Sequence, residues 1–147
     1  MGTSIHAHVE VMTRDGVWHH YNAPHVERDY QLFAKMSGVR AESVGDASDL
    51  EPVAPIRGVP EDMSVVTLAI YEEHYAHSES YLTRQEIAKL SHWYLTRNPS
   101  ETPGGYHYLN GVFGYIKGGP LEALGGSSDD PKTWLFADVR IVFWFDC

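Results

Sequence analysis

Cysteine, basic residues and long apolar runs are all scarce in this sequence of 147 residues. A single cysteine, Cys147, excludes an intramolecular disulfide framework and a cysteine-based zinc site. Eleven Lys and Arg against 20 Asp and Glu give a formal charge of −9, which disfavours tight binding to duplex DNA or RNA. No apolar run approaches the roughly 20 residues that a transmembrane helix needs, and the opening residues lack the basic and apolar parts of a secretory signal. We therefore expect a cytoplasmic protein without a membrane partner.

Polar aromatic side chains are abundant instead. The sequence contains 9 Tyr, 4 Trp, 5 Phe and 9 His. Such rings bury a large area while keeping a hydrogen-bonding tip, so they suit a mixed binding pocket. Tyrosine that replaces phenylalanine in a small core would give the same composition, and it is the competing interpretation.

Hydrophobic alternation predicts a strand near each end of the chain. Residues 4–12 alternate, and the Asp15-Gly16 turn signal predicts a hairpin with a return strand over residues 17–21. Residues 134–146 form the strongest strand pattern, and both of its faces carry large apolar groups, which is typical of a central strand. The core face of the first strand is expected to hold Ile5, Ala7, Val9 and Val11.

Three helices are expected, each with a capping signal at its start. Tyr30 to Ser37 follows Asp29 and precedes Gly38, Val65 to Tyr71 follows Ser64, and Thr83 to Arg97 opens on the capping box Thr83-Arg84-Gln85-Glu86.

These elements predict one α+β domain over residues 1–147. We expect a small antiparallel or mixed sheet that includes both terminal strands, with about three helices packed on one face. Residues 41–58 indicate a loop insertion, and the glycine-rich residues 100–130 indicate an irregular region. The segment 77–81 is expected to be a loop before the last helix.

Histidines on the first strand are the main candidates for chemistry. His6 and His8 are separated by about 6–7 Å on one strand face, so both rings can converge on one ligand or one ion. We assign His6, His8 and His77 as candidate acid–base residues. A divalent metal is left open, with His6 and His8 as its ligands. A solvated polar strand face is the competing interpretation.

A second group of residues could bind an anion. The free backbone N–H groups and the dipole of a helix N-terminus favour anions, and nearby hydroxyls add donors. Arginines form forks for phosphate or carboxylate. Local backbone hydrogen bonds and intramolecular salt bridges are the competing interpretations. The candidate ligand-binding residues are Glu10, Arg28, Tyr30, Arg40, Arg57, Ser78, Ser80 and Tyr81.

Five segments of the sequence carry a resemblance: Met1 to Glu10, Arg28 to Ala34 with Gly38 to Arg40, Pro55 to Asp62, His77 to Thr83, and Val139 to Asp146. Together they resemble an uncharacterised family common in phages and prophages. Its members open Met-Gly-Cys-Asp-Ile-His, followed after three residues by Glu. This sequence departs from them at Thr3 and Ser4, which weakens any metal site that needs the thiol or carboxylate there, and it has Tyr81 where Trp is usual.

The resemblance implies a phage setting and, with the polar aromatic residues, suggests a nucleotide ligand. We expect a counter-defence protein that recognises a nucleotide immune signal, such as a cyclic nucleotide. It would act as a hydrolase that cleaves the phosphodiester bond or as a non-catalytic sponge that sequesters the signal. A protein-binding inhibitor without a small-molecule ligand is the third alternative. The residues leave these alternatives open, and a homo-oligomer is also left open.

Overall fold

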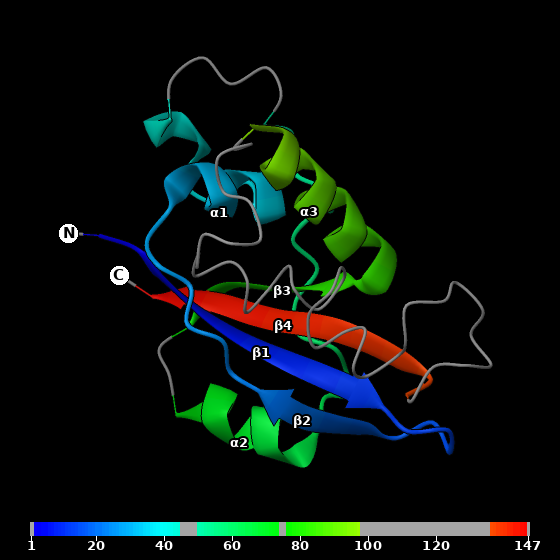
Figure 1. Cartoon of the computed structure of the whole chain (residues 1–147). Helices are drawn as coiled ribbons and strands as arrows, with labels where there is room; N and C mark the ends of the chain where they lie inside the picture. Colours follow the sequence, from blue (N-terminus) through cyan, green and yellow to red (C-terminus); the bar gives the residue numbers. More distant parts are fainter. Residues whose placement is uncertain (1, 45–49, 74–75, 98–135, 147) are drawn as a thin grey trace.

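The computed structural model describes residues 2–44, 50–73, 76–97 and 136–146. In these ranges the chain forms a four-stranded antiparallel sheet, in the order β2-β1-β4-β3, with helices on both faces (Figure 1). The predicted α+β class is confirmed. No helix in the described ranges is long and apolar enough to span a membrane.

The first and last strands form the centre of the sheet. β1 (Ser4–Met12) pairs along its whole length with β4 (Asp138–Asp146). Ser4 lies opposite Asp146, and Met12 lies opposite Asp138. The predicted first strand, its core face and its pairing with the last strand are therefore confirmed.

The two edge strands differ in how well the sequence indicates them. β2 (Trp18–Asn22) follows the predicted turn, in which the Gly16 amide donates to the Thr13 carbonyl. β3 (His77–Thr83) pairs with β4, so the expectation of a loop at residues 77–81 is wrong. A register shift between His77 and Ser80, with Ser78 at φ 55°, interrupts the alternation that marks a strand.

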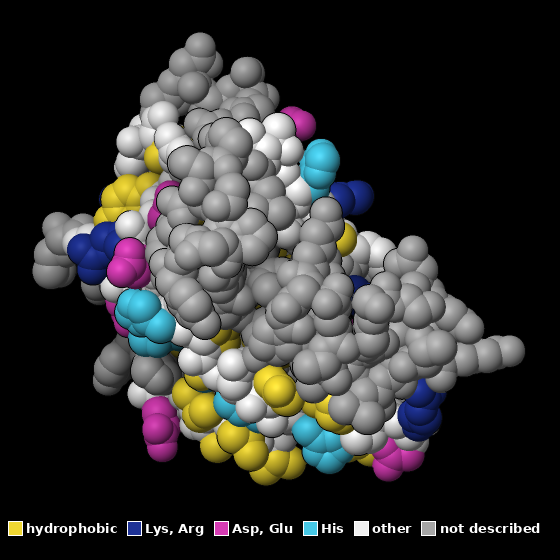
Figure 2. All heavy atoms as spheres, in the orientation of Figure 1, with side chains coloured by type: hydrophobic (Ala, Val, Ile, Leu, Met, Phe, Trp, Pro, Cys, Tyr) yellow, Lys and Arg dark blue, Asp and Glu magenta, His cyan; other side chains and the backbone are white. Residues whose placement is uncertain are grey.

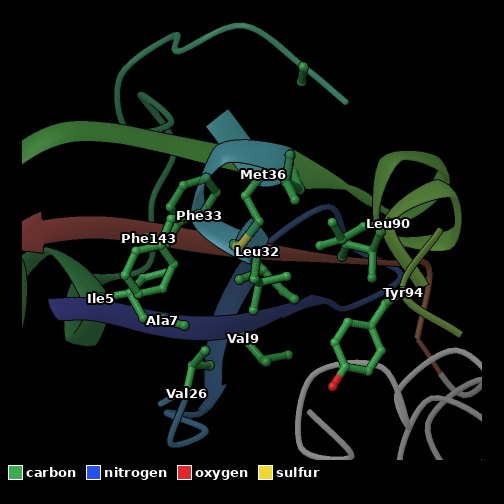
Figure 3. Packing of buried hydrophobic residues seen from close by; sticks show 14 of the residues in the cluster. Ile5, Ala7, Val9, Val26, Leu32, Phe33, Met36, Leu90, Tyr94 and Phe143 are labelled. Atoms are coloured by element: carbon green, nitrogen blue, oxygen red, sulfur yellow. The ribbon is translucent and has the colours of Figure 1, made fainter. Parts of the chain in front are cut away.

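Two helices cover the Ile5 face of the sheet. α1 (Tyr30–Ser37) is capped by the Asp29 carboxylate and ends at Gly38, whose φ of 84° suits glycine. α3 (Arg84–Arg97) opens on the predicted capping box, because Thr83 and Glu86 exchange side-chain and backbone hydrogen bonds. Between sheet and helices lies the core, whose members include Ile5, Ala7, Val9, Leu32, Phe33, Met36, Leu90 and Phe143 (Figure 3).

The third helix lies on the opposite face, so the expectation of helices on one face is wrong. α2 (Val65–Glu72) is capped by Ser64, and its Tyr71 ring contacts Trp144 edge-on at 5.1 Å (Figure 1). Trp144 and Val142 on β4 are large apolar groups that need cover on this second face. The outer side of α2 leaves Val65, Val66 and Leu68 exposed, and hydrophobic side chains gather over this part of the surface in Figure 2.

The two predicted irregular regions are described to different extents. Within the predicted insertion 41–58, a short 3-10 helix, η1 (Ala41–Ser43), precedes residues 45–49, which are not described. The glycine-rich region 100–130 and residues 134–135 of the predicted last strand also lie outside the described ranges.

A matched pair of leucines tests the packing. Leu90 on α3 is fully buried, whereas Leu68 on α2 is 40% exposed. Leu90→Ala should lower the free energy of unfolding by about 2–5 kcal/mol because it leaves a cavity. Leu68→Ala should change it by no more than about 0.5 kcal/mol. Urea unfolding of both variants measures the difference, and equal losses would contradict the assignment of these two faces.

Candidate functional site

The second face of the sheet carries a row of polar and aromatic side chains. Residues that lie directly opposite in an antiparallel pair share a face, so the register shows which side chains of the two central strands meet here. On this face β1 presents Ser4, His6, His8 and Glu10, and β4 presents Asp146, Trp144, Val142 and Arg140.

At one end of the row, His6 is held by a carboxylate. Its Nε2 lies 2.5 Å from Oδ2 of Asp146, the last described residue of β4. His6 lies opposite Trp144, so Asp146 is its diagonal neighbour across the two strands. The His6 side chain is 29% exposed, and it lines an open cleft of about 500 Å³.

The other wall of this cleft comes from the segment that joins β2 to α1. β2 ends beside Val9, and Pro24, which has no N–H for a ladder bond, follows two residues later. The chain then passes the start of β1, where Arg28 donates a hydrogen bond to Ser4 Oγ at 3.0 Å. Figure 2 shows histidine, basic and acidic side chains gathered near the end of the sheet where both termini lie. We call this the histidine cleft; it is lined by Ser4, Ile5, His6, His25, Val26, Glu27 and Arg28.

In the middle of the row, His8 is buried and paired with another histidine. Its Nδ1 lies 3.0 Å from Nε2 of His20 on β2, and its ring stacks on Trp144 with a centroid distance of 4.8 Å. His8 does not line the histidine cleft.

The Tyr71 phenol of α2 contacts the same Trp144 ring. Burial raises the pKa of this phenol, and the charge of Glu79 raises it further. Tyr71 is therefore a neutral hydrogen-bonding group at neutral pH.

At the far end of the row, a buried ion pair joins three elements. Glu10 is fully buried, and its Oε1 accepts from Arg140 Nε at 2.8 Å. The other carboxylate oxygen, Oε2, accepts from the backbone N–H of Ser64, which caps α2, at 2.8 Å. Arg140 also donates to the exposed carboxylate of Asp62 at 2.9 Å and lies 3.9 Å from the Trp18 ring centroid.

A second cleft, of about 530 Å³, opens beside this ion pair and is lined by Arg57, Tyr81 and Arg140 among others. Arg57 stacks over Tyr81 at 4.0 Å and forms a bidentate ion pair with Glu86. Burial acts to raise the pKa of Glu86, but hydrogen bonds from Arg57 and Thr83 outweigh it and hold that pKa below its usual value. Both arginines that line this cleft, Arg57 and Arg140, are thus already ion-paired with carboxylates of the chain.

The candidate site residues therefore separate into several places. His77 lies opposite Phe145 and stacks on it at 6.2 Å, so it is on the Ile5 face and does not meet His6 or His8. The Ser80 hydroxyl accepts from the Arg57 backbone N–H, and the Ser78 hydroxyl lies 3.0 Å from His77 Nδ1. The Glu86 carboxylate accepts from the N–H of Thr83, where the sequence analysis placed a bound anion.

Two further candidates anchor the start of β1. The Tyr30 hydroxyl accepts from the backbone N–H of Thr3, and Arg40 donates to the Thr3 hydroxyl at 2.8 Å. Arg40 also lies over the Tyr30 ring at 5.2 Å. Of the candidate residues, the histidine cleft therefore includes only His6 and Arg28 in its lining.

Several residues of these clusters escaped the sequence analysis. His25 is one histidine in an irregular segment, and only the observed course of that segment brings it to the cleft that His6 lines. Strand register determines which side chains Asp146 and Arg140 meet, and a loop contact brings Asp62 to Arg140. The matching alternation of β1 and β4 could have indicated the Glu10–Arg140 pair, because opposite charges often face each other across strands.

Neither a metal site among the described residues nor a similarity to known proteins indicates which function this protein has. Among residues 2–44, 50–73, 76–97 and 136–146, no group of three or more His, Cys, Asp or Glu side chains is placed to hold a metal ion. Comparisons with protein-family models, curated proteins and solved structures give no match. The site is therefore interpreted from its own geometry.

The two carboxylates that bind Arg140 provide a matched test of burial. Glu10→Gln should lower the free energy of unfolding by about 3–5 kcal/mol, because it removes the buried counter-charge of Arg140 and leaves only the exposed Asp62 carboxylate. Asp62→Asn should cost less than about 1 kcal/mol, because the Asp62 side chain is 67% exposed. Urea titrations measure both losses. A Glu10→Gln protein as stable as Asp62→Asn would show that the buried pair does not hold the fold together.

The lowered pKa of Glu86 predicts a pH-dependent contribution to stability. Because the pKa is lower in the folded state, the contribution is present above the unfolded-state pKa and is lost as pH falls through the folded-state pKa. The stability difference between the wild type and Glu86→Gln should therefore shrink as the pH falls below about 5. Glu42→Gln, an exposed control with the same charge change, should show no such trend. A difference that is independent of pH would contradict the Arg57–Glu86 assignment.

Proposed function

We propose that this protein binds a nucleotide signal through a phosphate group at the histidine cleft. The observation that carries the proposal is Arg28, which lines the same cleft as His6 and His25 and whose guanidinium donates to the Ser4 hydroxyl. No carboxylate among the described residues lies within ion-pair distance of Arg28, in contrast to Arg57 and Arg140. Guanidinium groups bind phosphate oxygens with charge-assisted hydrogen bonds, so an unpaired arginine in a cleft is suited to an anionic ligand.

The rest of the lining supports a ligand that also carries a ring. A cleft of about 500 Å³ is within the range of small-molecule sites. The imidazoles of His6 and His25 supply rings on which a base could stack, whereas Ile5 and Val26 are only 9% exposed and belong mainly to the core. The ligand we propose therefore has a phosphate at Arg28 and a base against the imidazole rings.

The biological role that we propose follows the phage resemblance. A phage protein that removes a nucleotide immune signal from its host would act in counter-defence, either by capturing the intact nucleotide or by cleaving it. The protein-inhibitor alternative has one described feature in its favour, the exposed Val65, Val66 and Leu68 on α2. The histidine cleft favours the nucleotide because it combines a cation, proton-transfer groups and concave shape.

Equilibrium binding to a nucleotide panel tests the proposal. The panel contains cyclic di-AMP, cyclic di-GMP, cyclic triadenylate and ADP-ribose, each titrated calorimetrically at low salt. We expect at least one to bind, and Arg28→Gln to weaken it by about 10- to 100-fold through loss of a charged hydrogen bond.

Arg14→Gln is the matched control, because Arg14 lies in the exposed β1–β2 turn and the variant loses the same charge. Its affinity should stay within about twofold of the wild type. Equal weakening by both substitutions would indicate non-specific attraction rather than a site at Arg28. A panel without any bound member would contradict the proposed function.

A further inference from the structure

The histidine cleft contains two imidazoles from different elements. His6 projects from the centre of the sheet, and His25 lies in the exposed segment between β2 and α1. Neither His8 nor His77 lines this cleft, so His25 takes the place that the sequence analysis gave to those residues. Two imidazoles at one site can supply a general base and a general acid to the same reaction.

The contacts of the two histidines distinguish their roles. His6 is held at 2.5 Å by Asp146, and a carboxylate in that position stabilises the imidazolium that forms when a histidine accepts a proton. His6 is therefore suited to be the base. His25 is exposed to solvent, where it can exchange protons with water between turnovers.

We infer that the histidine cleft cleaves ribonucleotide 3′–5′ phosphodiester bonds, using the 2′-hydroxyl of the substrate as nucleophile. This inference rests on the proposed function and names its substrate class. His6 and His25 are the catalytic residues, Arg28 binds the phosphate that reacts, and Asp146 is a positioning residue that acts through His6.

The step balances within the substrate and the two imidazoles. His6 accepts the proton of the 2′-hydroxyl as the 2′-oxygen forms a bond to phosphorus. The bond from phosphorus to the 5′-oxygen breaks, and His25 donates a proton to that leaving oxygen. The products are a 2′,3′-cyclic phosphate and a free 5′-hydroxyl. Arg28 stabilises the negative charge that gathers on the non-bridging oxygens.

This route makes the ribose the source of specificity. A substrate without a 2′-hydroxyl has no nucleophile, so it should bind the cleft and remain intact. The route also needs no added ion, so cleavage should persist in EDTA. Both consequences separate this reaction from the attack of a water molecule on the phosphorus.

Cleavage of the ribodinucleotide uridylyl-(3′→5′)-adenosine tests the inference directly. The wild-type protein in EDTA should release adenosine and uridine 2′,3′-cyclic phosphate, with a bell-shaped pH profile. His25→Ala should lower kcat/KM at least about 100-fold, and so should His6→Ala. The His25 variant is the decisive one, because this residue is exposed and its loss should leave the melting temperature unchanged. His19→Ala, an exposed histidine on β2, should keep full activity.

Rescue by the conservative variant tests the positioning role of Asp146. Asp146→Asn should lower kcat more than it raises KM, because His6 loses the carboxylate that holds it at 2.5 Å, whereas Asp146→Glu should restore part of the rate. A purely structural role would lower the amount of folded protein and leave kcat per folded molecule unchanged. The carboxylate of Glu27 also lines the cleft, and Glu27→Gln provides the comparison for a general change in charge.

The outcomes separate this inference from the proposed function. If nucleotides bind but the ribodinucleotide stays intact, the inference is overturned and the protein captures its ligand without cleaving it. Equal cleavage of the 2′-deoxy analogue, loss of activity in EDTA, or full activity in His25→Ala would also overturn it. If no nucleotide binds, the proposed function falls as well.

Discussion

The buried ion pair between Glu10 and Arg140 sets the register on which the second face of the sheet depends. A carboxylate with no exposed surface must keep its partner, because an unpaired charge in the interior costs several kcal/mol. A one-residue slip of β1 against β4 would turn Glu10 into the apolar core, and a two-residue slip would separate it from Arg140. The same carboxylate accepts from the capping residue Ser64, so it also fixes where α2 begins.

The histidine cleft is a distant consequence of that register. With Glu10 opposite Arg140, Ser4 lies opposite Asp146 and His6 becomes the diagonal neighbour of Asp146. The ion pair at one end of the sheet thus determines which histidine meets a carboxylate at the other end. Arg140 and Arg57 are occupied by this framework, whereas Arg28 stands apart from it, which is why the cleft at Arg28 is the better candidate for an anionic ligand.

Local patterns in the sequence predicted most of the elements, and long-range geometry decided the site. Ser4–Met12, the cap at Asp29 and the Thr83–Glu86 capping box depend on neighbouring residues, so they could be predicted. β3 was missed because its bulge at Ser78 breaks the alternation. The sequence indicated only part of the candidate site, because of its three histidines only His6 lines the cleft, together with Arg28. His8 is buried in a pair with His20, and His77 lies on the opposite face of the sheet. The contribution of His25 depends on the course of an irregular segment, which no local pattern specifies.

The central claim is that His6 and His25 face the same bound nucleotide. Titration with the uncleavable 2′-deoxy analogue of uridylyl-(3′→5′)-adenosine tests it, with the imidazole signals followed by NMR and assigned from single His→Ala variants. The account predicts that the His6 and His25 signals shift together with one dissociation constant, while those of His19 and His77 stay in place. A ligand that shifts His77, or that shifts one cleft histidine without the other, would contradict it.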